Sequence, residues 1–256
     1  MKYQFAEQYS DLEQWHWWFR GRQRILDAVL RRELPGRQSL SIASLGCGPA
    51  EGLVWLKPLA QPHGCVVGLD AEVLHARHVA LDVSYVIGTL ENVPLAAASF
   101  DLVLALDVLE HLDDDARGLR EAARLLKPGG LLVVTVPALP SLWGGQDVVS
   151  HHRRRYLKRT LGQTFARAGL PAPRLTYFNV LLFAPVACTR WLRRALGQAQ
   201  QPRSDFDDNQ PGLLNEILAS VFAAERYLIH RLPMPVGVSL LAILHLGQDS
   251  LGEAGS

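Results

Sequence analysis

Two glycines and one aspartate offer the clearest chemistry in this chain. Residues 44–52 read SLGCGPAEG and lie between an apolar run and a helix-like run, and the next apolar run ends in Asp70. Gly46 and Gly48 allow backbone angles that a side chain forbids, so a turn here brings main-chain N–H groups close to a ligand. A carboxylate at the end of the following strand accepts hydrogen bonds from two ribose hydroxyls. The pair predicts a ligand that contains a nucleoside.

The spacing of the glycines disfavours a dinucleotide. The G-x-G-x-x-G fingerprint needs a third glycine where this chain has Glu51. A helix N-terminus attracts a pyrophosphate, but a carboxylate at that position repels it. An NAD-dependent reductase is therefore the second interpretation, and the chain also lacks a Tyr-x-x-x-Lys pair near the fourth and fifth expected strands.

Two further motifs follow the glycine turn and Asp70 in order. Residues 107–112 read DVLEHL and residues 125–130 read LLKPGG. Over residues 38–137 the four motifs together resemble the class I S-adenosylmethionine-dependent methyltransferases, which implies S-adenosyl-L-methionine as the cofactor. Ser44 and Thr89 stand where that family usually has acids. The resemblance implies these cofactor contacts: Gly46, Cys47 and Gly48 at the methionine part, Asp70 and Ala71 at the ribose, Thr89, Leu90 and Glu91 at the adenine, and Asp107 on the floor of the crevice.

The histidine of the DVLEHL motif is the candidate for acid–base chemistry. Asp107 directly follows the fourth expected strand, so it lies at the carboxyl edge, where open α/β sheets bind ligands. A helix that begins there places Glu110 and His111 on a similar face. Methyl transfer needs a base only when the acceptor must lose a proton, and we predict His111 as that general base. The alternatives are that His111 packs and that Asp107 caps the helix.

An aromatic and basic block precedes the glycine turn. Residues 15–22 read WHWWFRGR, and a subset of the same methyltransferases begins with a similar run. One interpretation is a lid whose rings cover the cofactor while Arg20 and Arg22 pair with its carboxylate. The other is a helix whose rings pack on the sheet.

A second basic block follows the fifth expected strand. Residues 151–156 read HHRRRY and match a recurring His-x-Arg-Arg-Tyr pattern of the same subset. We predict that this block binds an anionic group of the acceptor, with the alternative of a solvated basic turn. The predicted acceptor residues are Trp143, His152, Arg154, Arg155 and Tyr156.

Alternating apolar and helix-like segments predict the fold. Continuous apolar runs are typical of strands that are covered on both faces, and we expect such strands at residues 40–45, 65–69, 85–87, 101–106, 131–136, from 175 and at 238–246. The fold class is therefore α/β, a doubly wound, mostly parallel seven-stranded sheet. The first expected helix ends near residues 35–36. Further helices are expected at 51–59, in a segment that runs through 126, at 157–168 and at 213–232. The expected parts are an N-terminal helical lid (1–36), an α/β core (37–178), a helical insertion with a loop (179–212), and a C-terminal helix with the last strand of the core (213–256).

Composition limits the function classes. The chain has 256 residues, of which 48% are hydrophobic and 20% charged, and a net charge of +1 predicts no general affinity for nucleic acid. Three cysteines have no metal-binding spacing, so we expect no metal. The N-terminus lacks a signal-like apolar run, so we expect residence in the cytoplasm.

The apolar run at 180–196 is too short to cross a bilayer, which leaves a roof over the pocket or peripheral contact with lipid. The predicted partner is a small or lipid-linked acceptor, methylated at oxygen or nitrogen. The non-enzymatic alternative is a cofactor-binding scaffold.

Overall fold

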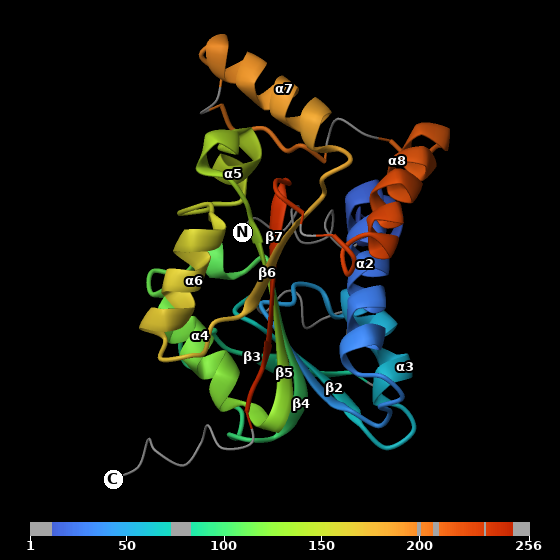
Figure 1. Cartoon of the computed structure of the whole chain (residues 1–256), viewed down its shortest axis with the longest axis vertical. Helices are drawn as coiled ribbons and strands as arrows, with labels where there is room; N and C mark the ends of the chain where they lie inside the picture. The colour runs from blue at the N-terminus through green and yellow to red at the C-terminus, as the bar shows by residue number, and fades with distance from the viewer. Residues whose placement is uncertain (1–11, 73–82, 199–200, 207–209, 233, 248–256) are drawn as a thin grey trace.

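A seven-stranded sheet forms the centre of the computed structural model, which describes residues 12–72, 83–198, 201–206, 210–232 and 234–247 (Figure 1). The strand order is β3-β2-β1-β4-β5-β7-β6, and β7 runs antiparallel to both of its neighbours. This arrangement confirms the predicted mostly parallel sheet. The strands are β1 (Ser41–Leu45), β2 (Cys65–Asp70), β3 (Ser84–Ile87), β4 (Phe100–Leu106), β5 (Leu126–Pro137), β6 (Arg174–Phe178) and β7 (Ser239–His245).

Helices cover both faces of the sheet, which explains the continuous apolar strands. In β4, Val103 and Ala105 pack against α4 (Asp115–Arg124) and α6 (Lys158–Arg167), while Leu102 and Leu104 belong to the core on the opposite face. The helices of that second face are α2 (Trp17–Glu33), α3 (Lys57–Ala60) and α8 (Leu213–Ala224). Figure 1 shows the two helical layers on either side of the sheet. Because successive strand residues point to opposite faces, a central strand such as β4 needs apolar side chains on both of its faces.

Four expected boundaries were wrong. The helix expected at 51–59 begins as a 3-10 helix, η1 (Ala50–Leu56), and becomes α-helical only in α3, where Pro58 lacks a donor for the preceding turn. No α-helix begins at Asp107: its φ is +55°, and the chain forms only the short 3-10 turn η3 (Leu109–His111). β5 already starts at Leu126, with residues 127–130 bulged out of its pairing with β4. α8 ends at Ala224, before the 3-10 turn η5 (Glu225–Tyr227), and the Glu225 carboxylate accepts the N–H groups of Val180 and Leu181.

The segments after β5 gather at the carboxyl edge of the sheet. They include η4 (Pro140–Leu142), α5 (Gly145–Val149) and α7 (Phe183–Ala195), and α7 lies across the top of the molecule in Figure 1. Among the described residues, no helix combines the length and apolar character that a membrane crossing requires.

Helix α2 is held at its N-terminus by side chains distant in sequence. The His16 ring accepts the N–H of Trp18 at 3.2 Å as the N-cap. Asn215 of α8 accepts the N–H of Trp17 at 2.8 Å and donates to the Trp15 carbonyl at 2.7 Å. At Gly21, a Cβ would lie 2.3 Å from the Phe222 ring, so only glycine lets α2 and α8 pack this closely. The aromatic block is therefore an ordered part of the fold.

We predict that His16 makes the stability of the protein depend on pH. Burial lowers the pKa of His16 to about 4, below the value of about 6.5 expected in the unfolded chain. Between these two pH values the unfolded state binds more protons, so the free energy of unfolding falls as the pH drops from 6.5 to 4, by up to about 3 kcal/mol for this residue. Urea unfolding at several pH values measures the slope. His16→Asn keeps an N-cap acceptor without titrating and is expected to lose less stability over this range; equal slopes for the two proteins contradict the prediction.

Candidate functional site

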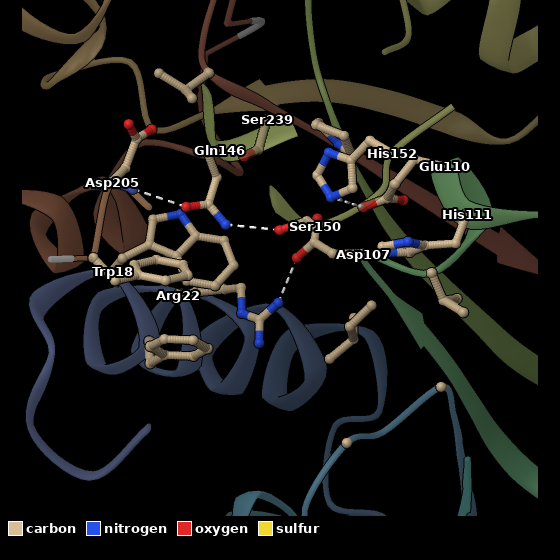
Figure 2. A pocket seen from close by; sticks show the side chains of 18 of the residues that line it. Trp18, Arg22, Asp107, Glu110, His111, Gln146, Ser150, His152, Asp205 and Ser239 are labelled. Atoms are coloured by element: carbon tan, nitrogen blue, oxygen red, sulfur yellow. Dashed lines mark hydrogen bonds and ion pairs between the residues drawn. The ribbon is translucent and has the colours of Figure 1, made fainter. Parts of the chain in front are cut away.

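A cavity of about 690 Å³ opens at the carboxyl edge of the sheet. Figure 2 shows part of its lining, with Trp18 and Arg22 of α2 facing residues that follow β4 and β5. We call one side the glycine end and the other the histidine end. The glycine end comprises residues 46–49, 70–72 and 88–91, and the histidine end comprises Glu110, His111, Gln146, Ser150 and His152.

The glycine turn has the left-handed backbone that its sequence predicts. Gly46 and Gly48 have φ angles of +64° and +65°. A Cβ on Gly46 would lie 2.4 Å from the Val108 side chain, whereas none of the described atoms lies within 4 Å of a Cβ position on Gly48. The N–H groups of the turn are already bound, those of residues 46 and 47 by the Leu69 carbonyl and that of Gly48 by Asp70 at 2.8 Å. The turn therefore offers a ligand an open surface at Gly48.

Asp70 organises this end of the cavity. Its carboxylate accepts the N–H groups of Gly48 and, at 2.9 Å, of Glu72. Thr89 and Leu90 also line the cavity, and so does Glu91, whose carboxylate accepts the N–H of Asp114 at 3.1 Å. Ala71 and Cys47 complete the wall, and burial raises the pKa of the Cys47 thiol, which stays protonated. All eight residues expected at the methionine, ribose and adenine parts thus border one space.

An ion pair between Arg22 and Asp107 also borders the cavity. The left-handed conformation of Asp107 turns its side chain toward α2, where the Arg22 guanidinium binds it (Figure 2). The same guanidinium lies 4.3 Å from the centre of the Trp18 ring, a cation–π contact. The expected pairing of Arg20 with a cofactor carboxylate receives no support, because Arg20 binds Glu216 on α8 and does not line this cavity.

Three ionisable side chains meet at the histidine end. Glu110 is fully buried, and burial together with Asp107 raises its carboxyl pKa well above the ordinary value. Burial and the neighbouring His152 lower the pKa of His111 to about 4. His111 is therefore neutral at pH 7, but an imidazole with so low a pKa is a weak base. Its position in the cavity agrees with the predicted contact to an acceptor, and its chemistry does not favour proton removal.

The second basic block mostly binds the protein itself. Arg154 donates to the carbonyls of Leu112 and Asp113, and the buried Tyr156 hydroxyl donates to Asp115 at 2.9 Å. Neither residue lines the cavity, and Trp143 does not line it either. The structure thus does not place these three residues at the cavity, and the side chains of Arg154 and Tyr156 bond to neighbouring segments instead.

Asp147 holds the remaining members of the block. Its carboxylate, 0% exposed, accepts from Arg155 at 2.8 Å and from the N–H of Gly144 at 2.8 Å, and it bonds to Nδ1 of His152 at 2.9 Å. Arg190 of α7 lies 3.4 Å from its other oxygen. Arg155 borders the cavity, but it is buried and already paired, so an acceptor anion does not meet a free guanidinium there.

Some cavity residues carried no sequence signal that we recognised. Gln146 accepts the N–H of Asp205 at 2.8 Å and bonds to Ser150 at 2.7 Å (Figure 2). The centre of the Phe206 ring lies 5.0 Å from the centre of the His16 ring and 5.2 Å from that of the Phe19 ring. In the sequence, Phe206 is the one aromatic residue of the polar segment 198–212. Such a residue indicates that the segment packs against other apolar side chains, here the aromatic block.

Comparison with known proteins agrees with the motifs. Residues 43–134 match a family model described as a methyltransferase domain. A Mycolicibacterium smegmatis protein named "probable S-adenosylmethionine-dependent methyltransferase" is 34% identical over 137 residues, which are 52% of this chain and 50% of that protein. A ubiquinone biosynthesis O-methyltransferase of Methylobacterium nodulans is 38% identical over 108 residues, 40% of this chain and 42% of that protein. The chain spans about half or less of the length of these curated relatives.

Solved structures match more of the chain at lower identity. An S-adenosylmethionine-dependent methyltransferase from Thermotoga maritima covers 93% of this chain and 96% of its own, with a TM-score of 0.53 and 18% identity. The [4+2]-cyclase SpnF covers 88% of this chain and 80% of its own, with a TM-score of 0.51 and 16% identity. These likenesses confirm the fold, and the second shows that the same fold serves different chemistry.

We expect Asp147→Asn to destabilise the protein by about 3–5 kcal/mol, because it leaves the buried Arg155 without its charged partner. Urea unfolding measures the change. The control is Asp113→Asn, whose carboxylate is 75% exposed and pairs with Arg153 at the surface, and it is expected to change stability by less than about 1 kcal/mol. A loss below about 1 kcal/mol for Asp147→Asn contradicts the prediction.

Proposed function

Because residues 43–134 form a methyltransferase domain of the class I S-adenosylmethionine-dependent family, we propose that this chain transfers a methyl group from S-adenosylmethionine to a small or lipid-linked acceptor, at oxygen or nitrogen. One observation carries the proposal: the glycine end and the histidine end are parts of one continuous cavity. Its size, about 690 Å³, lies within the range of pockets that hold small molecules and cofactors.

The glycine end fits the cofactor. The open surface at Gly48 leaves room for a ligand where a side chain would project, and Asp70 lies beside it with a carboxylate able to bind ribose hydroxyls. Thr89, Leu90 and Glu91 border the expected adenine position. S-adenosylmethionine supplies an electrophilic methyl group on a sulfonium.

The residues between the two ends align the reactants and exclude water. Arg22 and Asp107 form the wall beside the methionine part, and Arg22 remains the candidate partner for its carboxylate. Trp18, Phe19 and Phe206 cover the cavity from the side of α2. In an in-line displacement such positioning supplies much of the rate enhancement, so the enclosure suits methyl transfer.

The apolar roof supports an acceptor with a hydrophobic part. Leu182, Pro185 and Val186, at the start of α7, line the cavity. Further along α7, Trp191 and Leu192 are 50% and 60% exposed, which favours contact between this helix and a lipid-linked acceptor or its membrane. The O-methyltransferase activity named for the Methylobacterium relative favours oxygen over nitrogen as the methylated atom.

Two experiments separate the enzyme from its rivals. If the chain is a methyltransferase, S-adenosylhomocysteine forms from S-adenosylmethionine only when an acceptor is supplied. A scaffold binds the cofactor but forms no product with any acceptor. An NAD-dependent reductase binds NAD in calorimetry at least as tightly as S-adenosylhomocysteine, and that result contradicts the proposal. The side chain of Glu51, which disfavours a pyrophosphate, lies outside the described residues.

Asp70→Ala is expected to weaken binding of S-adenosylhomocysteine by about 1.5–3 kcal/mol, since a charged acceptor of two ribose hydroxyls is lost. Isothermal titration calorimetry measures the dissociation constant. Asp70→Asn keeps an oxygen that accepts the Gly48 N–H, so it separates loss of the ribose contact from loosening of the turn. The exposed Asp113→Ala is the matched control and is expected to bind like the wild type. An unchanged dissociation constant for Asp70→Ala refutes the ribose assignment.

A further inference from the structure

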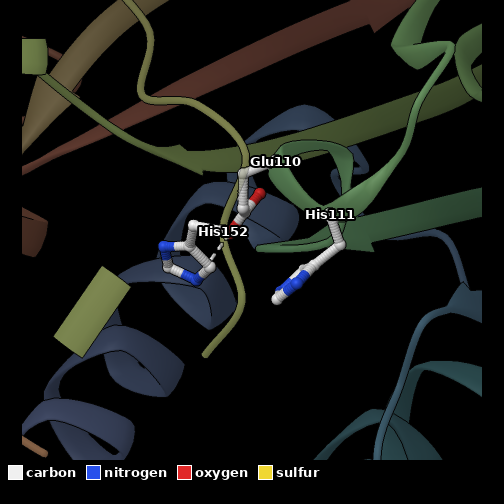
Figure 3. Close-up of side chains that lie close together, drawn as sticks. All are labelled: Glu110, His111 and His152. Carbon is white, nitrogen blue, oxygen red and sulfur yellow. Dashed lines mark ion pairs between the residues drawn. The ribbon is translucent and has the colours of Figure 1, made fainter. Parts of the chain in front are cut away.

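Three metal-binding side chains converge at the histidine end of the cavity. Glu110, His111 and His152 each place one ligand atom so that all three atoms lie within 4.8 Å of one another (Figure 3). Nε2 of His152 is 3.8 Å from a carboxylate oxygen of Glu110, and the two histidine rings meet edge to face with their centres 4.8 Å apart. Two of the residues come from η3 and one from the segment after α5, so the fold brings together groups that are distant in sequence.

The Glu110 carboxylate is the unusual member of this cluster. It is 0% exposed, and neither oxygen has a hydrogen-bond partner among the described residues. A buried carboxylate normally has hydrogen-bond donors, a cationic partner or a metal ion. An imidazole nitrogen of His111 and one of His152 each lie within 4.8 Å of a Glu110 oxygen, and neutral imidazole nitrogens bind metals.

The surrounding contacts orient both histidines. Nδ1 of His152 bonds to the Asp147 carboxylate at 2.9 Å, which leaves Nε2 directed at Glu110. Metal-binding histidines usually have such an outer carboxylate, which fixes the ring and its tautomer. Arg153 ties the two segments together, because its backbone N–H and its Nε donate to the carbonyls of Glu110 and His111 at 2.8 and 2.9 Å. The cluster is therefore held in place by the fold.

We propose that Glu110, His111 and His152 bind a divalent transition metal ion of the Zn²⁺ or Fe²⁺ class. Two imidazoles and one carboxylate are the protein ligands of catalytic zinc sites and of non-haem iron sites, both of which keep positions open for substrate. In a tetrahedral zinc site the ligand atoms lie about 3.4 Å apart, so closure around the ion requires movements of at most about 1.4 Å from the present spacing. The proposal departs from the sequence expectation that the chain binds no metal.

The open positions face the cavity, where the acceptor is expected; this role rests on the proposed function. An acceptor hydroxyl bound to the ion loses its proton to water more readily, because the cation stabilises the alkoxide. The alkoxide oxygen then forms a bond to the methyl carbon while the carbon–sulfur bond breaks, and that electron pair remains on sulfur. In this arrangement His111 binds the ion and does not remove the proton itself.

Metal binding by the full chain tests the proposal directly. The protein is stripped with a chelator and titrated with Zn²⁺ in a calorimeter, and Co²⁺ is used as a spectroscopic probe because its visible absorption reports coordination by the protein. We expect one Zn²⁺ per chain and a Co²⁺ spectrum that Zn²⁺ abolishes. Glu110→Gln and His111→Ala are each expected to weaken Zn²⁺ binding by about 100-fold or more. Mutation of a residue that only hydrogen-bonds to a metal ligand typically weakens binding by about 10–100-fold.

His151→Ala is the matched control, since this exposed neighbouring histidine does not belong to the cluster, and it is expected to bind Zn²⁺ like the wild type. If Glu110→Gln does not fold, as judged by circular dichroism, the partly buried His111 decides the test. No Zn²⁺ binding by the wild type, or equal binding by wild type and His111→Ala, overturns the proposal. Calorimetry with S-adenosylhomocysteine on the same samples keeps the two proposals apart: cofactor binding without Zn²⁺ binding overturns the metal site alone, and Zn²⁺ binding without cofactor binding overturns the proposed function.

Discussion

The buried carboxylate of Asp147 determines the geometry of the histidine end. It fixes the His152 ring, pairs with Arg155, accepts the N–H that begins α5, and lies within ion-pair distance of Arg190 on α7. Removing a carboxylate and two guanidinium groups from water is costly, and such a cluster persists only when the ions satisfy one another. Asp147 thereby links the segment after β5, the roof helix and the histidine that faces Glu110. Of the second basic block, His152 and Arg155 belong to this network, and the buried Arg155 guanidinium is already paired within it.

The Arg22–Asp107 pair makes the N-terminal segment part of the cavity. Asp107 follows β4 in the middle of the sheet, and Arg22 lies on α2, which packs against the C-terminal helix α8 and the core on one face of the sheet. The aromatic rings around Arg22 pack on the sheet and also form a wall of the cavity. The packing interpretation of the aromatic block is confirmed, and the same packing of α2 brings Trp18 and Arg22 to the cavity; the cofactor lid stays a prediction.

The sequence predicts the central strands β4 and β5 well, because they are buried on both faces and show a long apolar run. It also predicts the arrangement of the glycine end. The turn of Gly46 and Gly48 and the acid Asp70 follow neighbouring parallel strands, so the sheet topology brings them together. It fails for Arg20 and Arg154, whose partners lie on segments far away in sequence. A basic residue in a motif shows where a cation lies along the chain, but its partner depends on tertiary packing, which no local pattern encodes.

The short turn after β4 explains how one motif serves two ends of the cavity. A full α-helix from Asp107 would carry Asp107, Glu110 and His111 on a similar face. Instead, Asp107 has a positive φ and turns toward Arg22, while the 3-10 turn directs Glu110 into the interior and His111 into the cavity. The residues beside the expected cofactor and those beside the expected acceptor are thus four positions apart on one rigid segment. Their separation is set by the backbone of that turn, which is anchored to β5 by the bond from the Asp107 N–H to the Thr135 carbonyl and to the second basic block by Arg153.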